Sequence, residues 1–464
     1  MSGSVDSADI LAMDIAQLSQ QYGSGACSPV DTLDAMRSAI ESDTQGINAF
    51  CHLVWPAALQ AAQASEKRHR AGQALGPLDG VPVSIKDLTQ VAGWPTRCGS
   101  LATQDDPPAP VDAPSVVQLR AAGAVVFGKT TTTEFGWTVL SENPYSGLTR
   151  NPLNNAHSAG GSSSGAAAQV AAGWGPLALG SDAGGSVRIP ASYCGLVGFK
   201  PTFGLIPAAP ASAFAEFAHQ GVLTRSMQDC ITAMSVFSKG DPRDPSSLFS
   251  RSGSADGQER PLRIGWSRTL GAAQLPDADV AAAFEHTLAR LSAAGYQLEE
   301  VAPGIEDACA AMWTIWCSRV FESFQAWPPS RRELLGDKLR GLYRAGEQLG
   351  MAELAASQTR LRALGTALAR TFCDIDVLLT PSTPSVAPPA GRYLANGNES
   401  GENWFAMNGY AYPFNVSQQP ALSIPMGLGG QGLPVGLQIV GRKYHDKQVL
   451  QLGSALESLL EVSP

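Results

Sequence analysis

Two Gly-Gly-Ser turns lie close together in this 464-residue chain, in Ser158-Ala-Gly-Gly-Ser-Ser-Ser-Gly165 and in Gly180-Ser-Asp-Ala-Gly-Gly-Ser186. The apolar segment that follows them ends at Phe199-Lys-Pro201. Glycine loses more backbone entropy on folding than other residues, so chain reversal alone does not explain why so many glycines lie close together here. Backbone N–H groups and serine hydroxyls held close to a reacting group provide that reason. We therefore interpret the rest of the chain as a scaffold around this stretch.

Composition narrows the class of protein. With 44% hydrophobic residues, the chain can bury a large core. Its formal charge of −9 argues against a nucleic-acid-binding surface, which needs clustered positive charge, and favours a small-molecule partner. The eight cysteines form no C-x-x-C pair, so we expect neither a disulfide framework nor a metal site, and no cofactor is expected.

The N-terminal residues 1–10 are polar and lack the pattern of a signal peptide. No apolar run along the chain is long enough to predict a membrane span. The expected compartment is therefore the cytoplasm, with no membrane partner.

Apolar runs of strand length alternate with helical patterns along the chain. The clearest strands are expected at 81–86, 124–130, 176–181 and 376–381. Continuous apolar strands separated by helices indicate an α/β fold with a mostly parallel sheet that helices cover on both faces.

Length alone would allow two or three domains. Residues 1–70 are expected to form an N-terminal helical portion. The stretch 240–258 is rich in Pro, Ser, Asp and Gly, which is typical of a surface linker.

Lys86 closes an unusually apolar strand. The period of two in this strand sends Ser84 and Lys86 to one face and Asp87 to the other. Taken alone, Lys86 is compatible with an ordinary end-of-strand lysine whose stem packs while its charge reaches water. The serine-rich turns further along the chain favour a role in chemistry instead.

Two segments match known sequence motifs but lack the secondary structure that those motifs require. Residues 123–130 fit G-x-x-x-x-G-K-[ST], but the helix comes before the first glycine and a strand fills the middle, so we reject a phosphate-binding loop. Gly161-x-Ser163-x-Gly165 fits the nucleophile elbow of the α/β-hydrolases, which requires a strand before it; residues 151–157 predict a loop. That minor alternative would use His445 as its base.

Four segments together resemble the amidase signature family. They are Gly80-Val-Pro-Val-Ser-Ile-Lys-Asp87, Gly160-Gly-Ser-Ser-Ser-Gly165, Gly180-Ser-Asp-Ala-Gly-Gly-Ser-Val-Arg-Ile-Pro-Ala191 and Cys194-Gly-Leu-Val-Gly-Phe-Lys-Pro-Thr202. The resemblance spans nearly the whole chain. It implies one large α/β/α domain over residues 1–464 with a mixed sheet, and residues 80–202 as its catalytic core. It also implies hydrolysis of a C–N amide bond and a Ser-Ser-Lys catalytic set.

The resemblance assigns three catalytic residues. It implies that Ser186 is the acylated nucleophile, Ser162 the bridging serine on a cis peptide, and Lys86 the base. A serine hydroxyl must pass its proton to a positioned base. The motifs contain no histidine, so only a lysine held neutral by burial and by the absence of a nearby anion can serve. Ser162 can accept a hydrogen bond from one partner and donate to the other, as a proton relay does.

The glycine turn before the nucleophile is expected to bind the oxyanion. The N–H groups of Ala183, Gly184, Gly185 and Ser186 are the predicted donors and substrate-binding groups.

Three further residues are expected to support this geometry. Ser163 and Asp182 are expected to hold the site rather than react. Arg188 has two interpretations, a structural ion pair or an anchor for a substrate carboxylate, and the structural one is favoured.

Two other functions stay open. One is the glutaminase (A-type) subunit of a tRNA-dependent amidotransferase, which belongs to the same family and passes ammonia to a partner protein. The other is a catalytically silent structural subunit, which the filled catalytic positions disfavour. A homodimer is also left open, and the substrate is expected to be a small-molecule amide.

Overall fold

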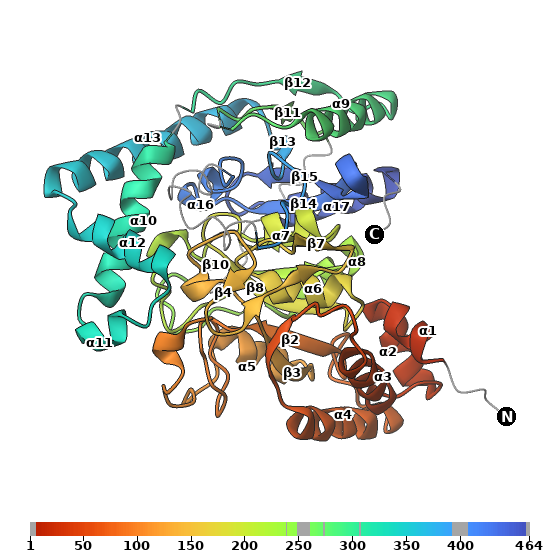
Figure 1. The fold of residues 1–464 in the computed structure, drawn as a ribbon. Helices are drawn as coiled ribbons and strands as arrows, with labels where there is room; N and C mark the ends of the chain where they lie inside the picture. Colours follow the sequence, from red (N-terminus) through yellow and green to blue (C-terminus); the bar gives the residue numbers. More distant parts are fainter. Residues whose placement is uncertain are drawn as a thin grey trace.

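The centre of the structure is a single eleven-stranded sheet, which runs from β2 and β3 in the lower part of Figure 1 to β12 at the top. The structure is a computed structural model that describes residues 6–237, 239–247, 260–271, 274–305, 308–391 and 407–460. In spatial order the strands are β1 (Phe50–Leu53), β3 (Val125–Thr130), β2 (Pro82–Lys86), β8 (Leu177–Asp182), β10 (His219–Thr224), β9 (Val197–Lys200), β14 (Ala421–Leu428), β15 (Pro434–Gly441), β13 (Val377–Pro381), β11 (Ile264–Trp266) and β12 (Leu298–Glu300).

The predicted α/β architecture with a mixed sheet is confirmed, with a smaller share of parallel pairing than expected. The neighbours β3–β2, β2–β8, β13–β11 and β11–β12 are parallel. The other six neighbour pairs are antiparallel. A strand buried on both faces has the same apolar sequence in either orientation, so the sequence pattern did not reveal this difference.

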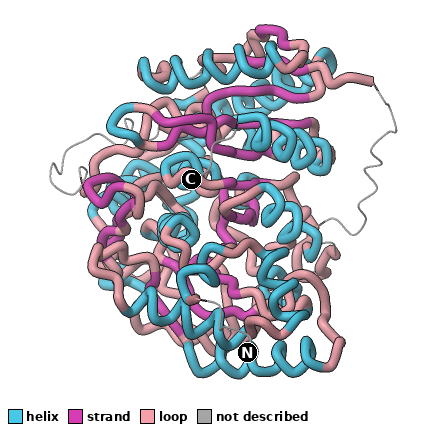
Figure 2. Tube along the Cα trace, turned by 90° about the vertical axis from the view of Figure 1, so that its right-hand side faces the viewer, coloured by secondary structure: helices cyan, strands magenta, loops and turns pink. Residues whose placement is uncertain are grey.

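Helices cover both faces of the sheet, as the view in Figure 2 also shows. On one face, apolar side chains of four helices pack against the sheet: α5 (Pro114–Ala121), α8 (Met227–Val236), α9 (Ala278–Ala293) and α17 (Asp446–Leu460). The other face is covered by α3 (Pro29–Glu41), α4 (Trp55–Arg70), α6 (Ser164–Ala171), α7 (Arg188–Tyr193), α10 (Cys309–Phe324), α12 (Asp337–Glu347), α13 (Met351–Asp374) and α16 (Pro413–Val416). The core is therefore two apolar layers, one on each side of the strands.

The alternation of side chains along β3 shows how sequence produces this layering. Val126 packs in the layer of α5 and α8, whereas Val125 and Phe127 pack against α4 and α6. All three side chains are nearly fully buried. A strand with apolar residues at every position is thus explained by burial on both faces.

The N-terminal portion is mainly helical, with β1 as its one contribution to the sheet. It contains α1 (Ser7–Ala12), α2 (Ile15–Ser24), α3 and α4. Ser28 caps α3, because its hydroxyl accepts a hydrogen bond from the Asp31 N–H at 3.1 Å, and Pro29 occupies the first turn.

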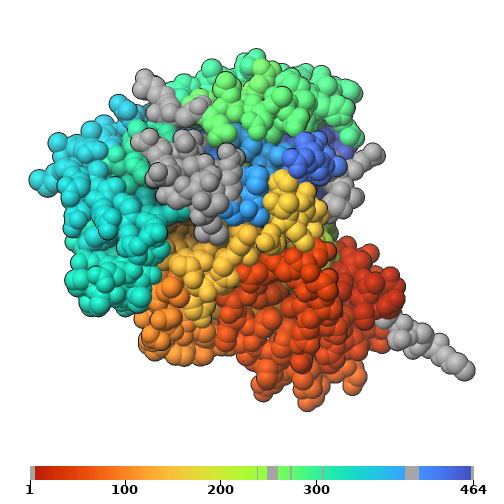
Figure 3. Space-filling view, viewed as in Figure 1, coloured from red at the N-terminus to blue at the C-terminus, as the bar shows by residue number. Residues whose placement is uncertain are grey.

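Helices α10, α11 (Pro329–Arg332), α12 and α13 form one flank of the molecule, at the left in Figure 1 and in Figure 3. Two small ribbons lie outside the main sheet: β4 (Glu142–Asn143) with β5 (Gly147–Leu148), and β6 (Arg150–Asn151) with β7 (Asn154–Ser158).

Only residues 240–247 of the expected linker 240–258 are described, and the remainder lies outside the described residues. Within the described part, Asp244 and Ser247 are buried. Asp244 accepts a hydrogen bond from the Ala208 N–H at 2.8 Å. This first part of the segment is therefore packed onto the turn that follows β9.

Candidate active site

Lys86 and the glycine turn meet because β2 and β8 are parallel neighbours. Ile85 of β2 pairs with Leu179 of β8. The carboxyl ends of parallel strands lie at the same edge of a sheet, where binding sites of α/β folds form. Lys86 is the last residue of β2, and Ser181 and Asp182 are the last residues of β8.

The side chain of Lys86 is completely buried and points away from the apolar layer that holds Val83 and Ile85. Its Nζ donates to Ser162 Oγ at 2.7 Å, and to the Ser181 hydroxyl and carbonyl at 3.1 and 3.2 Å. Burial lowers the pKa of Lys86 to about 7, against a smaller opposing effect of the Asp182 charge. At neutral pH a large fraction of this lysine is therefore unprotonated and can accept a proton.

Ser162 lies in the loop between β7 and α6. The Gly161–Ser162 peptide bond is cis, as expected from the sequence. The next residue connects this loop to the second turn, because the Ser163 N–H donates to the Ser186 carbonyl at 3.1 Å. Ser186 is 6% exposed, and its hydroxyl has no hydrogen-bond partner among the described residues. The structure thus brings Lys86, Ser162 and Ser186 together at one edge of the sheet.

The turn from Ala183 to Ser186 has two kinds of N–H group. Gly185 donates to Asp182 Oδ1 at 2.8 Å, so its N–H is committed within the protein. The role of Gly185 as an oxyanion donor stays a prediction, and in this structure its N–H is directed at Asp182. Gly185 also has a conformational role, since its φ of +117° is in a region that favours glycine. Among the described residues, the N–H groups of Ala183, Gly184 and Ser186 have no acceptor, which leaves three donors for a ligand.

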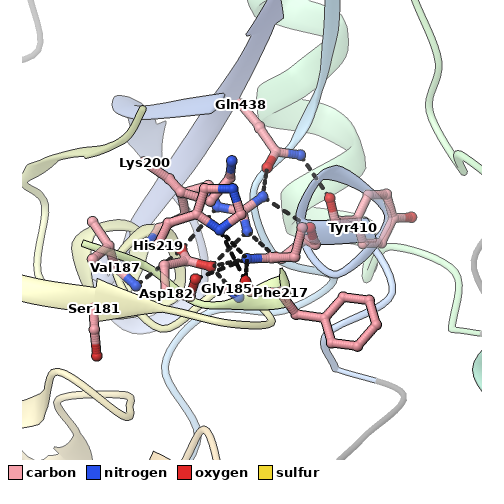
Figure 4. A network of polar contacts seen from close by, with 12 residues as sticks. Ser181, Asp182, Gly185, Val187, Lys200, Phe217, His219, Tyr410 and Gln438 are labelled. Carbon is pink, nitrogen blue, oxygen red and sulfur yellow. Dashed lines mark hydrogen bonds and ion pairs between the residues drawn. The ribbon is translucent and has the colours of Figure 1, made fainter. Parts of the chain in front are cut away.

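Asp182 and Arg188 support this turn through a buried ion pair, and Figure 4 shows Asp182 beside Gly185 and Val187. Both side chains are fully buried, and Arg188 binds the carboxylate through Nε at 3.0 Å and Nη2 at 2.8 Å. Burial alone would raise the pKa of Asp182. The charge and hydrogen bonds of Arg188 outweigh that effect and hold its pKa well below the usual range. The carboxylate also accepts from the Val187 N–H at 3.1 Å, so its charge orients the backbone around Ser186.

The remaining donors of Arg188 are also committed inside the protein. Nη1 donates to Gln438 Oε1 at 2.8 Å and to the Ala411 carbonyl at 2.9 Å, and Nη2 donates to Asn415 Oδ1 at 2.7 Å. The structural interpretation of Arg188 agrees with these contacts, because no face of the guanidinium is left for a substrate carboxylate.

Two further basic residues complete the network in Figure 4. Burial lowers the pKa of Lys200 well below its usual value, and its Nζ donates to the Gln419 carbonyl. Burial likewise lowers the pKa of His219, whose Nδ1 lies 2.9 Å from the Phe217 carbonyl. No described contact joins Lys200 or His219 to Lys86. We therefore assign both residues to the network that supports the turn.

The structure shows the surroundings of the rejected phosphate-binding loop and of the minor alternative, the nucleophile elbow. Lys129 of the apparent phosphate-binding loop is buried at the end of β3 and pairs with Asp87 at 2.8 Å. A short strand, β7, does precede Ser163, where the sequence predicted a loop. It pairs with β6 and, at His157, with Pro389, outside the main sheet. The Ser163 hydroxyl donates to the Ser181 carbonyl at 3.2 Å. His445 lies between β15 and α17. Strands β10, β9 and β14 separate β15 from β8, so β15 and β8 are about 19 Å apart at ordinary strand spacing.

Several site residues were missed by sequence reasoning. Ser181 contacts Lys86 directly, and its place in the Gly-Ser-Asp motif was the available signal. Asn415 and Gln438 hold Arg188 from segments more than 220 residues away along the chain. No local pattern marks them, because only folding brings them to the turn.

The described ranges contain neither a metal-binding cluster nor a membrane-spanning helix. No group of three or more His, Cys, Asp or Glu side chains there could hold a metal ion. No helix there is both long and apolar enough to cross a membrane.

Known proteins match this chain over almost its full length. Residues 31–450 match the family described as Amidase. An acylamidase of Rhodococcus erythropolis is 33% identical over 96% of this chain and 94% of its own. The A-type glutamyl-tRNA(Gln) amidotransferase subunit of Synechococcus sp. (strain CC9605) is 32% identical over 97% of each chain.

The fold is also similar to that of a solved structure over almost the full length of the chain. The crystal structure of a bacterial aryl acylamidase of the amidase signature family superposes with a TM-score of 0.87, at 28% identity over 97% of both chains. Sequence profile, relatives and fold agree with the resemblance carried by the glycine and serine turns. This chain belongs to the amidase signature family.

Proposed function

We propose that this protein is an amidase that hydrolyses the C–N bond of a small-molecule amide through an acyl-enzyme on Ser186. The observation that carries the proposal is the contact of Lys86 Nζ with Ser162 Oγ at 2.7 Å inside a fully buried site. A pKa of about 7 suits this lysine to accept and return a proton near neutral pH.

The reaction follows from the order of these groups. The Ser186 hydroxyl adds to the amide carbonyl, while its proton passes to Ser162 and the proton of Ser162 passes to Lys86. The oxyanion accepts hydrogen bonds from the N–H groups of Ala183, Gly184 and Ser186. Lys86 then returns a proton through Ser162 to the departing nitrogen as the C–N bond breaks. Water adds to the acyl-enzyme by the same relay and releases the carboxylate.

The relatives support the reaction class. One is an acylamidase and one solved structure is an aryl acylamidase. The products here are a carboxylate and ammonia or an amine. We place the enzyme in the cytoplasm, acting without a metal, a cofactor, nucleic acid or a membrane, and as a monomer or homodimer.

The test is covalent labelling of the nucleophile. A serine-reactive fluorophosphonate, followed by peptide mapping, should place one adduct on Ser186. The Ser186→Ala variant should take up no label, while Ser163→Ala should be labelled as wild type. An adduct on Ser163 with Ser186 untouched would support the nucleophile elbow instead. An unlabelled protein without amide turnover would indicate a silent structural subunit.

A second candidate is the glutaminase subunit of a tRNA-dependent amidotransferase, because subunits of that kind are also about one-third identical over the whole chain. Glutamine brings an ammonium and a carboxylate that need charged partners. The three atoms nearest to a Cβ built on Gly184 of the oxyanion turn belong to Asn408 and Trp316, neither of which is charged. This environment favours the amidase.

Steady-state assays of the isolated chain discriminate between the two. The amidase should hydrolyse simple neutral amides without a second polypeptide. Glutaminase activity that appears only with a copurifying partner would favour the amidotransferase subunit.

A further inference from the structure

An aromatic cluster lies beside the oxyanion turn. Trp137 and Phe214 have ring centroids 4.1 Å apart, and Trp316 of α10 lies 4.5 Å from Phe214 and 5.2 Å from Trp137. The Trp316 indole N–H donates to the Trp137 carbonyl at 3.1 Å, which fixes the orientation of that ring. The three side chains come from separate parts of the chain and are all buried.

The cluster reaches both sides of the reacting groups. A Cβ built on Gly136 would lie 3.3 Å from Ser162 Oγ and 3.7 Å from Phe214 Cε2. A Cβ built on Gly184, in the oxyanion turn, would lie 3.6 Å from Trp316 Cη2. One ring of the cluster is therefore close to the relay serine, and another is close to the oxyanion donors.

Asn408 adds a polar group at the same place. Its Nδ2 lies 3.5 Å from the Cβ position of Gly184. The residue is only 1% exposed, and its Oδ1 is buried without a hydrogen-bond partner among the described residues. A buried amide that is left unsatisfied destabilises a protein unless a ligand satisfies it. The Trp137 indole N–H is buried and unsatisfied in the same cluster.

We propose that Asn408 hydrogen-bonds the scissile amide and that Trp137, Phe214 and Trp316 bind a planar ring carried by that amide. The substrate class is then a neutral amide with an aromatic group one or two bonds from the C–N linkage. Aromatic rings in contact favour one another beyond simple apolar burial, whereas a saturated ring of equal size lacks this preference. The proposal rests on the proposed amidase function and deepens it.

The proposed binding site for an aromatic ring is tested with pairs of substrates. Within each pair, the amide bond has the same intrinsic reactivity. Phenylacetamide is compared with cyclohexylacetamide for the acyl side, and N-benzylacetamide with N-(cyclohexylmethyl)acetamide for the amine side. In one of the two pairs, wild-type kcat/KM should favour the aromatic member, and Trp316→Leu should lower that preference about three- to tenfold. Trp266→Leu, in β11 and in the other apolar layer, is the matched control and should leave the preference unchanged.

Equal rates for the aromatic and saturated members of both pairs would overturn the ring subsite. So would a Trp316→Leu variant that slows aromatic and saturated substrates by the same factor.

The role of Asn408 is tested with amides and methyl esters of the same acid, which share an acyl-enzyme but differ in the leaving N–H group. Asn408→Leu removes the hydrogen bond at nearly constant volume. It should lower kcat/KM for the amide up to about tenfold and leave that for the ester unchanged. The thermal midpoint of the free enzyme should not fall, because the variant removes an unsatisfied buried group.

A structural Asn408 gives a different result. The thermal midpoint would then fall, or amide and ester would lose activity equally in both Asn408→Leu and Asn408→Ala, and the proposal would be wrong. Fluorophosphonate labelling of Ser186 in each variant separates this failure from failure of the proposed function, since labelling needs the nucleophile and not the ring subsite.

Discussion

Replacing Lys86 by methionine should stabilise the protein while abolishing its activity. The folded protein holds this lysine at a pKa of about 7, against 10.5 for an unperturbed side chain. Each unit of difference corresponds to about 1.4 kcal/mol, so burying Lys86 costs on the order of 5 kcal/mol at pH 7. Its hydrogen bonds to Ser162 and Ser181 return about 1 kcal/mol each. The Lys86→Met variant should therefore gain about 2 kcal/mol in the free energy of unfolding at pH 7.

The pH dependence of this gain is the sharper prediction. Between pH 7 and pH 10.5 the unfolded chain binds a proton at Lys86 that the folded protein lacks. Wild-type stability should thus rise with pH by about 1.4 kcal/mol per unit from this residue, and the variant should lack that rise. The difference between the variant and the wild type should change by about 3 kcal/mol from about pH 7.5 to about pH 9.5, so that the wild type becomes the more stable protein at the higher pH. Urea unfolding of both proteins at the two pH values measures it.

A matched control is Lys129→Met. Lys129 is equally buried but pairs with Asp87 at 2.8 Å, so its removal leaves a buried carboxylate without its partner. That variant should lose roughly 3–5 kcal/mol. A Lys86→Met protein whose difference from wild type is the same at both pH values would disprove the low pKa, because Lys86 would then keep its proton in the folded protein.

Three other substitutions probe the support of the site. Asp182→Asn leaves the Arg188 charge buried without its partner and should lower the free energy of unfolding in urea by roughly 3–5 kcal/mol. Gly165→Ala would place a Cβ 2.0 Å from a backbone oxygen, so its thermal midpoint should fall by the equivalent of about 1–3 kcal/mol or more. Ser163→Ala loses a supporting hydrogen bond and should keep kcat/KM within about tenfold of wild type, whereas Ser162→Ala should lose on the order of 10⁴-fold in kcat.

The strands that the sequence predicted best are those buried on both faces. The runs that became β2, β3, β8 and β13 are apolar at nearly every position, and all of them lie inside the sheet. Strand β10 was missed, because His-Gln-Gly-Val-Leu-Thr has only two strongly apolar residues. It is inserted between β8 and β9 as an antiparallel neighbour, and it accounts for part of the shortfall in parallel pairing.

The candidate site was predictable where its groups share one segment. The motif around Ser162 and Ser186 and the strand end at Lys86 carry the reacting groups in local sequence patterns. The groups that hold or surround them do not. Asn408 and Trp316 reach the oxyanion turn from distant parts of the chain, and isolated Asn and Trp residues have no pattern that marks a binding role.

The contact of the Gly185 N–H with Asp182 could not be predicted either. In sequence, Gly185 is one of four consecutive residues with equivalent N–H groups. Only the position of the Asp182 carboxylate, fixed by Arg188, decides which N–H groups it takes.

Whether neutral Lys86 is the base is decided by the pH dependence of kcat/KM. Activity should rise about tenfold per pH unit below pH 7, through one ionisation near 7, and stay level on the alkaline side. Lys86→Ala should lose on the order of 10⁴-fold in kcat, and His445→Ala should reproduce the wild-type profile. A dead His445→Ala variant beside an active Lys86→Ala variant would rule out this mechanism and require a histidine-based triad.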